Sequence, residues 1–340
     1  MTNWIKNEDN SENVVISSRI RLARNLIDYP FPNKLRKEES EEIIKKVKDT
    51  ILKGNTVLKD EFEFYKMSEL DEIERKIMVE NHLISIDLGK NENAGVLIKK
   101  DETVSIMINE EDHLRIQTLF SGFKLNEAWD IADKIDDILE ENLNYAFDER
   151  LGYLTSCPTN VGTGLRASIM VHLPALVELG YINGVLNAAN KIGLAVRGIY
   201  GEGSGSLGNI YQISNQLTLG RDENEIIGNI IGISKQIIEK ELSAREMLKN
   251  KLGPKLEDRF FRSLGILKYS RLISSKEAMN LLSNVKLGIE MGYINEFTTR
   301  DIDKLMIEIQ PAYQLRLYNS MDSIERDMNR AKFIREKLSI

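Results

Sequence analysis

The chain has 340 residues, of which 42% are hydrophobic, so it is long enough to bury one large core or two ordinary ones. Its 46 Lys and Arg against 53 Asp and Glu give a formal net charge of -7, which argues against a general nucleic-acid-binding protein with a basic surface. Cys157 is the single cysteine, so an intrachain disulfide is excluded, and the three histidines offer no zinc-type ligand spacing.

The sequence predicts no membrane attachment. Its first ten residues, MTNWIKNEDN, are neither basic nor apolar, and no apolar run is long enough to cross a bilayer. We therefore expect a cytoplasmic protein that contacts neither a membrane nor nucleic acid directly.

The first third of the chain predicts short strands around one helix, because apolar residues alternate in the strand segments and recur every three to four residues in the helical one. The predicted elements are a strand over 12–24, a helix over 37–52, a strand over 61–67, and a hairpin over 94–100 and 104–109.

The middle is mixed and the end is helical. A helix is predicted over 126–143, and a strand with a Gly/Pro loop over 152–168 leads into a second predicted helix, 169–179. From about Asn224 helical periodicity dominates. The sequence thus predicts an α+β catalytic domain over 1–247 and a smaller α-helical domain over 248–340.

The stretch RGIYGEGSGSLGNIYQIS, residues 197–214, contains the glycine spacing of a dinucleotide-binding loop. That fingerprint requires a helix after the glycines, but Ile210, Tyr211 and Ile213 alternate as in a strand. The prediction is instead a loop between two strands, with Arg197 before it and Glu202 within it.

Arginines lie at strand ends and loop edges of the first domain. In SSRIRLAR the two-residue period places Arg19 and Arg21 on one face. An isolated pair is typical of a solvated strand, but Arg115, Arg166 and Arg197 occupy similar positions. Planar guanidinium groups bind phosphate oxygens with two hydrogen bonds, so the set favours a phosphate site.

Two further motifs have structural explanations when taken alone. NEEDHLR, residues 109–115, is compatible with a helix start capped by Asn109, with Glu111 pairing with Arg115 one turn on. Cys157, which precedes Pro158, is compatible with a buried thiol.

Taken together, SSRIRLAR, NEEDHLR, TSCPTNVGTGLRAS and VRGIYGE, in this order over most of residues 14–220, resemble the phosphagen kinase (ATP:guanido phosphotransferase) superfamily. The resemblance implies an antiparallel sheet flanked by helices and a kinase that uses ATP with Mg²⁺. The metal is expected to be held mainly by the nucleotide and water, with no metal-binding residues in the chain.

The resemblance also implies roles for individual residues. Glu111 and Glu202 are expected to bind the acceptor guanidinium as catalytic carboxylates, with Cys157 in a supporting role. The residues expected to contact ATP are Ser17, Ser18, Arg19, Ile20, Arg21, His82, Arg115, Arg166, Ala167, Ser168, Ile169, Met170, Arg197, Gly198, Ile199, Tyr200, Gly201 and Glu202.

The expected chemistry agrees with these residue types. Phosphoryl transfer needs positioning and charge neutralisation, which arginines and magnesium supply. A guanidinium is protonated and a poor nucleophile, so carboxylates must orient it and accept a proton. The sequence lacks a Walker A loop and the H-R-D and D-F-G motifs of serine/threonine and tyrosine kinases.

The sequence departs from the small-substrate members of the superfamily. No helical domain precedes the arginine strand, so we expect an open acceptor site, and Tyr200 stands where those enzymes have a second arginine. Both features, with RDMNRA at residues 326–331, resemble the bacterial protein arginine kinases. In that subfamily the motif implies an allosteric phosphoarginine site formed here by Arg326, Asp327, Arg330 and Ala331. Helical periodicity alone predicts that Arg326, Asp327 and Arg330 face water.

Three functions remain open at this point. The favoured one is a protein arginine kinase that marks proteins for Clp-protease degradation and controls a stress-response repressor. The alternatives are a kinase for free arginine or another small guanidino compound, and a phosphoarginine-binding adaptor without catalysis. The resemblance further implies protein substrates with accessible arginines, a zinc-binding activator protein and a homodimer formed by the C-terminal helices.

Overall fold

The computed structural model describes residues 3–6, 14–54, 57–199, 206–319 and 322–339. The chain forms two compact units, each assembled from segments that are distant in sequence. Unit 1 comprises residues 1–8, 17–169 and 214–231, and unit 2 comprises residues 9–16, 170–213 and 232–340.

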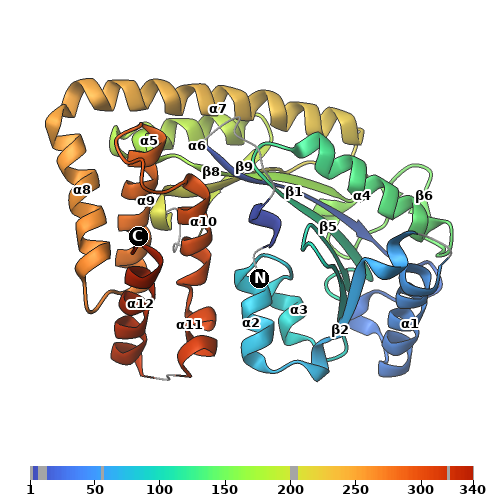
Figure 1. Cartoon of the computed structure of the whole chain (residues 1–340). Helices are drawn as coiled ribbons and strands as arrows, with labels where there is room; N and C mark the ends of the chain where they lie inside the picture. Colours follow the sequence, from blue (N-terminus) through green and yellow to red (C-terminus); the bar gives the residue numbers. More distant parts are fainter. Residues whose placement is uncertain (1–2, 7–13, 55–56, 200–205, 320–321, 340) are drawn as a thin grey trace. The chain divides into compact units, whose positions relative to one another are not determined.

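Eight strands hydrogen-bond in the order β2-β3-β4-β5-β1-β8-β10-β9 (Figure 1). Their bounds are β1 Val15–Arg24, β2 Phe62–Lys66, β3 Gly95–Lys99, β4 Val104–Ile108, β5 Leu114–Ser121, β8 Leu165–His172, β9 Leu194–Gly198 and β10 Ile210–Asn215. The β2–β3, β3–β4, β4–β5 and β1–β5 pairs are antiparallel. A separate short hairpin joins β6, Phe147–Asp148, to β7, Gly152–Tyr153.

The strands and the helix predicted in the first third of the chain are confirmed, but this region also contains two helices, Glu72–Glu80 and Ile86–Lys90, that the sequence does not predict. Ile20 and Leu22 of β1 are fully buried while Arg19 and Arg21 are half-buried, as alternation requires. The helices of this unit are α1 Lys37–Lys53, α2 Glu72–Glu80, α3 Ile86–Lys90 and α4 Leu125–Glu140, and the 3-10 helices are η1 Asn3–Lys6, η2 Pro32–Lys34, η3 Val57–Asp60, η4 Met67–Glu69 and η5 Pro158–Asn160.

The helix predicted over 169–179 is wrong over its first residues and is confirmed only for Pro174–Glu178. Strand β8 continues to His172, and only the short helix α5, Pro174–Glu178, follows, with a proline at its first position. Nearly every residue of β8 is buried, so both faces of this strand are covered. Such a strand has an apolar run without alternation, which resembles a buried helix in sequence.

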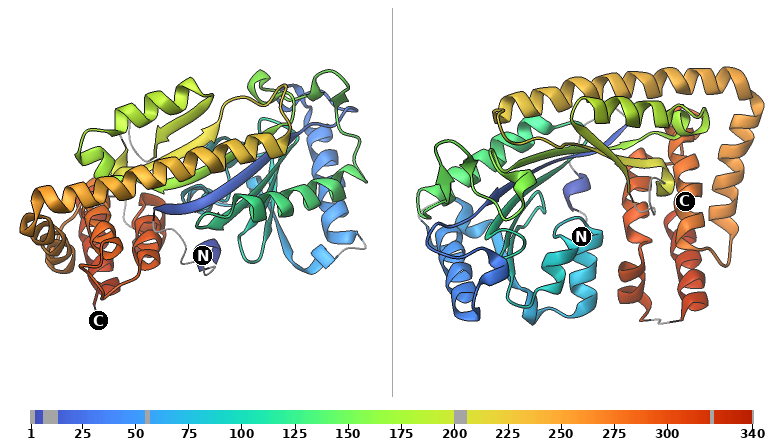
Figure 2. Two further views of the ribbon diagram at one scale, coloured as in Figure 1. Left: turned by 90° about the horizontal axis from the view of Figure 1, so that it is seen from above. Right: turned by 180° about the vertical axis from the view of Figure 1, so that it is seen from behind.

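Unit 2 is mostly helical, and the helical periodicity predicted from about Asn224 onward is confirmed. In addition to α5 it contains η6 Leu207–Asn209 and the helices α6 Ile182–Lys191, α7 Glu223–Leu252 (from residue 232 on), α8 Pro254–Tyr269, α9 Ser275–Glu290, α10 Thr299–Glu308, α11 Pro311–Tyr318 and α12 Ser323–Lys337. Helix α9 packs against α8 and α10, and α12 packs against α8 and α11, so these helices form a bundle (Figure 2). Helix α7 runs without interruption through residues 247–248, where the sequence places a domain boundary.

A buried ionic cluster lies inside unit 2. Glu290 is fully buried and pairs with Arg245 at 2.8 Å and with Lys286 at 3.5 Å. Despite burial, these cations and His172 hold the pKa of Glu290 at about 2. Lys286 also bonds Asp303 at 2.7 Å, so the cluster connects α7, α9 and α10.

Candidate active site

Two neighbouring strands of unit 1 present arginines on one face of the sheet. In the antiparallel register of β1 and β5, Ala23 lies opposite Arg115. Arg21 is two residues from Ala23, so it shares a face with Ala23 and with Arg115. Arg21 of SSRIRLAR and Arg115 of NEEDHLR are therefore neighbours in the sheet, although they lie about 94 positions apart in the chain.

A third arginine joins them from β8. Arg166 lines a cavity of about 60 Å³ together with Arg21, Arg115 and Glu111. Burial and the positive charges of Arg19, Arg115 and Arg166 hold the pKa of Arg21 well below its usual range. Within the described residues, Nε of Arg21 is buried without a hydrogen-bond partner. Concentrated positive charge of this kind suits a polyanionic ligand.

The NEEDHLR segment is a turn and not the helix start that its sequence allows. The backbone N–H of Asn109 donates to the carbonyl of His113 at 2.9 Å, which closes the β4–β5 connection. Asn109 has a φ of 59°, a left-handed conformation that asparagine tolerates. Its buried side chain donates to the carbonyl of Ser40 at 3.0 Å, so tertiary contacts decide this conformation.

Glu111 and Arg115 form the expected pair across this turn. Nη2 of Arg115 lies 2.9 Å from Oε2 of Glu111, and Nη1 lies 2.7 Å from Glu110. Burial raises the pKa of Glu111, against the lowering effect of Arg115, and the nearby carboxylates of Asp112, Glu110 and Asp87 raise it further. A carboxylate with a raised pKa is a stronger proton acceptor.

Glu110 is not among the site residues that the sequence predicts. Its side chain is only 2% exposed, against 43% for Glu111, and it accepts from the hydroxyl of Ser85 at 2.6 Å as well as from Arg115. Glu110 therefore helps to orient Arg115, one of the residues expected to contact ATP. The one signal in the sequence was its position beside Glu111.

Cys157 lies at the start of η5 and is half-buried. Its Sγ is 3.0 Å from the hydroxyl of Thr159, and its carbonyl accepts from the hydroxyl of Thr155 at 2.7 Å. These contacts fix the loop on both sides of the thiol. Within the described residues no histidine is recorded in hydrogen bonding to it.

His82 also lies in unit 1. It has a φ of 61°, and its carbonyl accepts from Gln117 of β5 at 2.8 Å. Burial and the charge of Arg19 lower the pKa of the imidazole to about 3, so it is neutral at physiological pH.

The other residues expected to contact ATP fall into three groups. Ser17, Ser18, Ile20, Ala167, Ser168, Ile169 and Met170 are buried within β1 and β8. Ser18 accepts from the N–H of Lys124 and donates to the carbonyl of Gly122, both at 2.9 Å. Arg197, Gly198 and Ile199 lie at the end of β9 in unit 2, with Arg197 exposed. Tyr200, Gly201 and Glu202 lie outside the described residues.

The RDMNRA motif lies on α12, and the prediction that Arg330 faces water is wrong. Arg330 is 3% exposed and donates to the carbonyls of Ile309 at 3.1 Å and Ile273 at 3.0 Å. It also pairs with Asp327. Arg326 is half-buried and Ala331 is fully buried. These hydrogen bonds give the buried guanidinium of Arg330 backbone partners, which explains how a charged side chain is accommodated inside the unit.

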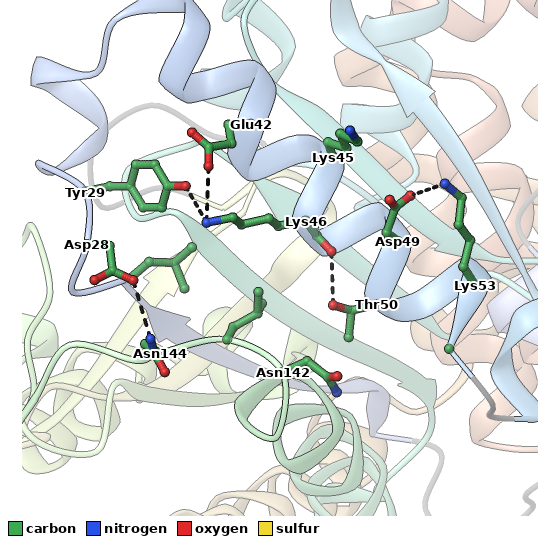
Figure 3. Close-up of a pocket in the computed structure, with 13 residues that line it drawn as sticks. Asp28, Tyr29, Glu42, Lys45, Lys46, Asp49, Thr50, Lys53, Asn142 and Asn144 are labelled. Atoms are coloured by element: carbon green, nitrogen blue, oxygen red, sulfur yellow. Dashed lines mark hydrogen bonds and ion pairs between the residues drawn. The ribbon is translucent and has the colours of Figure 1, made fainter.

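A second cavity of unit 1, of about 580 Å³, lies beside α1 and shares no lining residue with the arginine cavity (Figure 3). Nζ of Lys46 lies 2.6 Å from the Tyr29 hydroxyl and 3.3 Å from Glu42, and Lys53 pairs with Asp49 at 2.9 Å. Lys46 and Lys53 are thus each neutralised by a carboxylate of the same cavity.

The described residues contain neither a metal-ligand cluster nor a membrane-spanning helix. Across the described ranges, no group of three or more His, Cys, Asp or Glu residues is arranged to hold a metal ion. None of the helices in the same ranges is long and apolar enough to span a membrane.

The arginine-lined site and the sheet agree with the family to which the sequence matches. The model of the ATP:guanido phosphotransferase C-terminal catalytic domain matches residues 42–244, so the chain belongs to the ATP:guanido phosphotransferase family. The model of the protein-arginine kinase McsB C-terminal domain matches residues 253–340.

Individual relatives agree with this assignment. The chain is 52% identical over 330 residues to the protein-arginine kinase of Caldanaerobacter subterraneus subsp. tengcongensis, covering 96% of this chain and 98% of the relative. It is 48% identical over 341 residues to the protein-arginine kinase of Brevibacillus brevis, covering 100% of this chain and 96% of that one.

Solved structures show the same fold. Lombricine kinase superposes with a TM-score of 0.60 at 25% identity, covering 68% of this chain and 67% of that one. The duplicated taurocyamine kinase of Schistosoma mansoni superposes with a TM-score of 0.61 at 25% identity, over 75% of this chain. The match spans 38% of that duplicated protein. The predicted α+β fold, an antiparallel sheet flanked by helices with a helical C-terminal region, is therefore confirmed.

Proposed function

We propose that this chain transfers the γ-phosphate of ATP to the guanidino group of arginine side chains in proteins. The observation that carries the proposal is the convergence of Arg21, Arg115 and Arg166 on one cavity beside the carboxylate of Glu111. Relatives that are about half identical over nearly their full length are named protein-arginine kinase, which supports this acceptor.

The donor side of the reaction uses the arginines. Their planar guanidinium groups bind phosphate oxygens through paired hydrogen bonds and neutralise the charge that shifts during transfer. Arg197 is proposed as a further phosphate ligand. Magnesium bound with ATP would supply further charge neutralisation, and we expect phosphate oxygens and water to hold it.

The acceptor side uses two carboxylates. Glu111 orients the guanidinium by hydrogen bonding and accepts the proton that leaves the attacking nitrogen, a role for which its raised pKa is suited. Glu202 is proposed as the second carboxylate. Cys157 supports the arrangement without forming a covalent bond, because in-line transfer aided by arginines needs no phosphoenzyme.

A second candidate is phosphorylation of a small guanidino compound. The solved structures that share this fold are named lombricine kinase and taurocyamine kinase, and this observation favours a small acceptor. The full-length relatives favour protein arginine more strongly, because their identity is about twice as high.

The C-terminal domain, residues 248–340, is proposed to dimerise and to bind phosphoarginine as an allosteric ligand. The proposed contacts are Arg326, Asp327, Arg330 and Ala331 of α12. Arg330 already bonds two backbone carbonyls, so Arg326 is the residue whose truncation tests binding with the least damage to the helix bundle.

The cellular role is proposed from the family resemblance. The protein is expected to act in the cytoplasm, to mark substrates for the Clp-protease machinery and to control a stress-response repressor. A zinc-binding protein is proposed as its activator.

The test is incubation with ATP, Mg²⁺ and casein, followed by peptide mass spectrometry under neutral conditions. Phosphorylated arginines that disappear on acid treatment would support the proposal, because N–P bonds are acid-labile. Phosphoryl transfer to free arginine alone would support the small-acceptor alternative. Phosphoarginine binding without ATP turnover would support an adaptor.

A further inference from the structure

The acidic residue that follows Glu111 is completely buried and bonds to another segment of the chain. Oδ1 of Asp112 accepts from the backbone N–H of Ser156 at 2.7 Å and from the side-chain amide of Asn25 at 2.6 Å. Ser156 directly precedes Cys157. A single carboxylate oxygen thus links the turn that carries Glu111 to the loop that carries the cysteine.

Asn25 extends this link to the strand that bears the phosphate-binding arginines. It directly follows β1 and is 2% exposed. Its Oδ1 accepts from the N–H of His113 at 2.9 Å, and its Nδ2 donates to the carbonyl of Leu154 at 3.0 Å as well as to Asp112. Three segments therefore meet at Asp112 and Asn25: the end of β1, the turn and the cysteine loop.

The three consecutive acids of the turn have different environments. Glu110 points inward to Arg115 and Ser85, and Asp112 points inward to Asn25 and Ser156. Glu111 lies between them with 43% of its side chain exposed. The proposed catalytic carboxylate is thus flanked by two buried carboxylates that fix the backbone on either side of it.

We propose that Asp112 is a positioning residue for phosphoryl transfer, which holds Glu111 and the Cys157 loop in one arrangement at the end of β1. The proposal rests on the proposed function, in which Glu111 is the proton acceptor. Asp112 touches neither substrate in this account and acts through the segments that it joins. Misplacement of a catalytic group by about 1 Å can cost a factor of about 100 in rate.

Two substitutions separate positioning from bulk stability. Asp112→Asn keeps an oxygen at the Oδ1 position, so it can still accept both hydrogen bonds. Asp112→Ala removes the acceptor and leaves the N–H of Ser156 and the amide of Asn25 without it. Asp101→Ala is the matched control, because Oδ1 of Asp101 likewise accepts two bonds, from the N–H and hydroxyl of Thr103, in the β3–β4 turn.

The experiment measures kcat, KM for ATP and the alkylation rate of Cys157 by iodoacetamide in the full chain. For Asp112→Ala we expect kcat to fall about tenfold or more with KM for ATP within about twofold, and alkylation to accelerate severalfold as the loop loosens. For Asp112→Asn we expect kcat and the alkylation rate to remain within about threefold of the parent. Asp101→Ala should match the parent in both quantities. A parental kcat and alkylation rate in Asp112→Ala would overturn the proposal, as would equal impairment of Asp112→Asn.

If Asp112→Ala does not fold, Asp112→Glu provides the decision, because it keeps the charge but displaces the acceptor oxygen. A lower kcat in folded Asp112→Glu supports positioning, and a parental kcat contradicts it. Glu111→Gln is assayed alongside. If Glu111→Gln turns over at the parental rate, the proposed function fails. If Glu111→Gln is inactive while Asp112→Ala is fully active, only the positioning role fails.

Discussion

Glu111 and Arg115 form an ion pair in which Oε2 lies 2.9 Å from Nη2. The first is the proposed proton acceptor for the guanidinium, and the second is a proposed phosphate ligand. Glu110 pairs with Nη1 of the same guanidinium group at 2.7 Å. One short turn therefore carries both the proposed contact to the guanidinium that receives the phosphate and the proposed contact to ATP.

Replacing Glu111 should stop turnover without preventing ATP binding. We expect Glu111→Gln to lower kcat at least about a hundredfold, because an amide cannot accept the proton. Glu202→Gln should behave similarly. Coupled-enzyme assays give kcat and calorimetry gives ATP affinity, with the exposed Glu149→Gln as the control. Normal activity in either variant would remove that residue from the mechanism.

The arginine clamp predicts a different result. Arg166→Lys and Arg197→Lys should each weaken ATP binding and turnover about tenfold or more, since a lysine cannot span two phosphate oxygens. Arg150→Lys, in the β6–β7 turn, is the matched control. Unchanged ATP affinity and rate in the two clamp variants would show that these arginines do not bind phosphate.

Cys157 should be supportive and not covalent. Cys157→Ser is expected to retain partial activity, since a hydroxyl can still bond Thr159 and the proposed transfer forms no bond to sulfur. Rapid acid-free quench and mass spectrometry during turnover would detect a phosphocysteine. Its appearance would contradict the mechanism.

His82 should make stability depend on pH. Its pKa is about 3 in the folded protein against 6.5 in the unfolded chain, so between these values the unfolded state binds the extra proton. Stability should therefore fall as pH decreases from 6.5 towards 3. Asparagine tolerates the same left-handed backbone. In His82→Asn the slope of the free energy of unfolding against pH should decrease by the contribution of about one bound proton. Urea unfolding at several pH values measures it, and an unchanged slope would contradict the burial of a neutral imidazole.

Phosphoarginine should bind the C-terminal domain through α12. We expect Arg326→Ala to weaken binding of free phosphoarginine about tenfold or more, because a charge-assisted hydrogen bond is lost. Lys332→Ala, an exposed substitution on the same helix, is the control. Calorimetry that shows equal binding to Arg326→Ala and the parent would argue against this site.

Local patterns in the sequence predicted much of the fold. Strand β1 was readable because Arg19 and Arg21 alternate with buried Ile20 and Leu22. The same reasoning failed for residues 169–172, because a strand covered on both faces carries no alternation. It also failed at 109–113, where charges spaced as on a helix lie on a turn held by the distant Ser40.

The site was only partly predictable for a related reason. Residue types and the family resemblance indicated the arginines and Glu111. The buried partners that orient them come from far along the chain, such as Ser85 on Glu110 and Asn25 on Asp112. No periodicity encodes such pairs, because their contacts depend on how the sheet brings loops together. Arg330 was placed wrongly because helical periodicity assumes that a charged side chain faces water.

In the proposed function, the cluster of Glu111 and the arginines phosphorylates arginine within proteins. The most direct measurement is neutral-pH peptide mass spectrometry of casein after incubation with ATP, Mg²⁺ and either the parent or Glu111→Gln. We predict acid-labile phosphate on arginine residues with the parent and at least about a hundredfold less with Glu111→Gln. Phosphate found only on serine, threonine or free arginine, or equal arginine phosphorylation by both proteins, would contradict the claim.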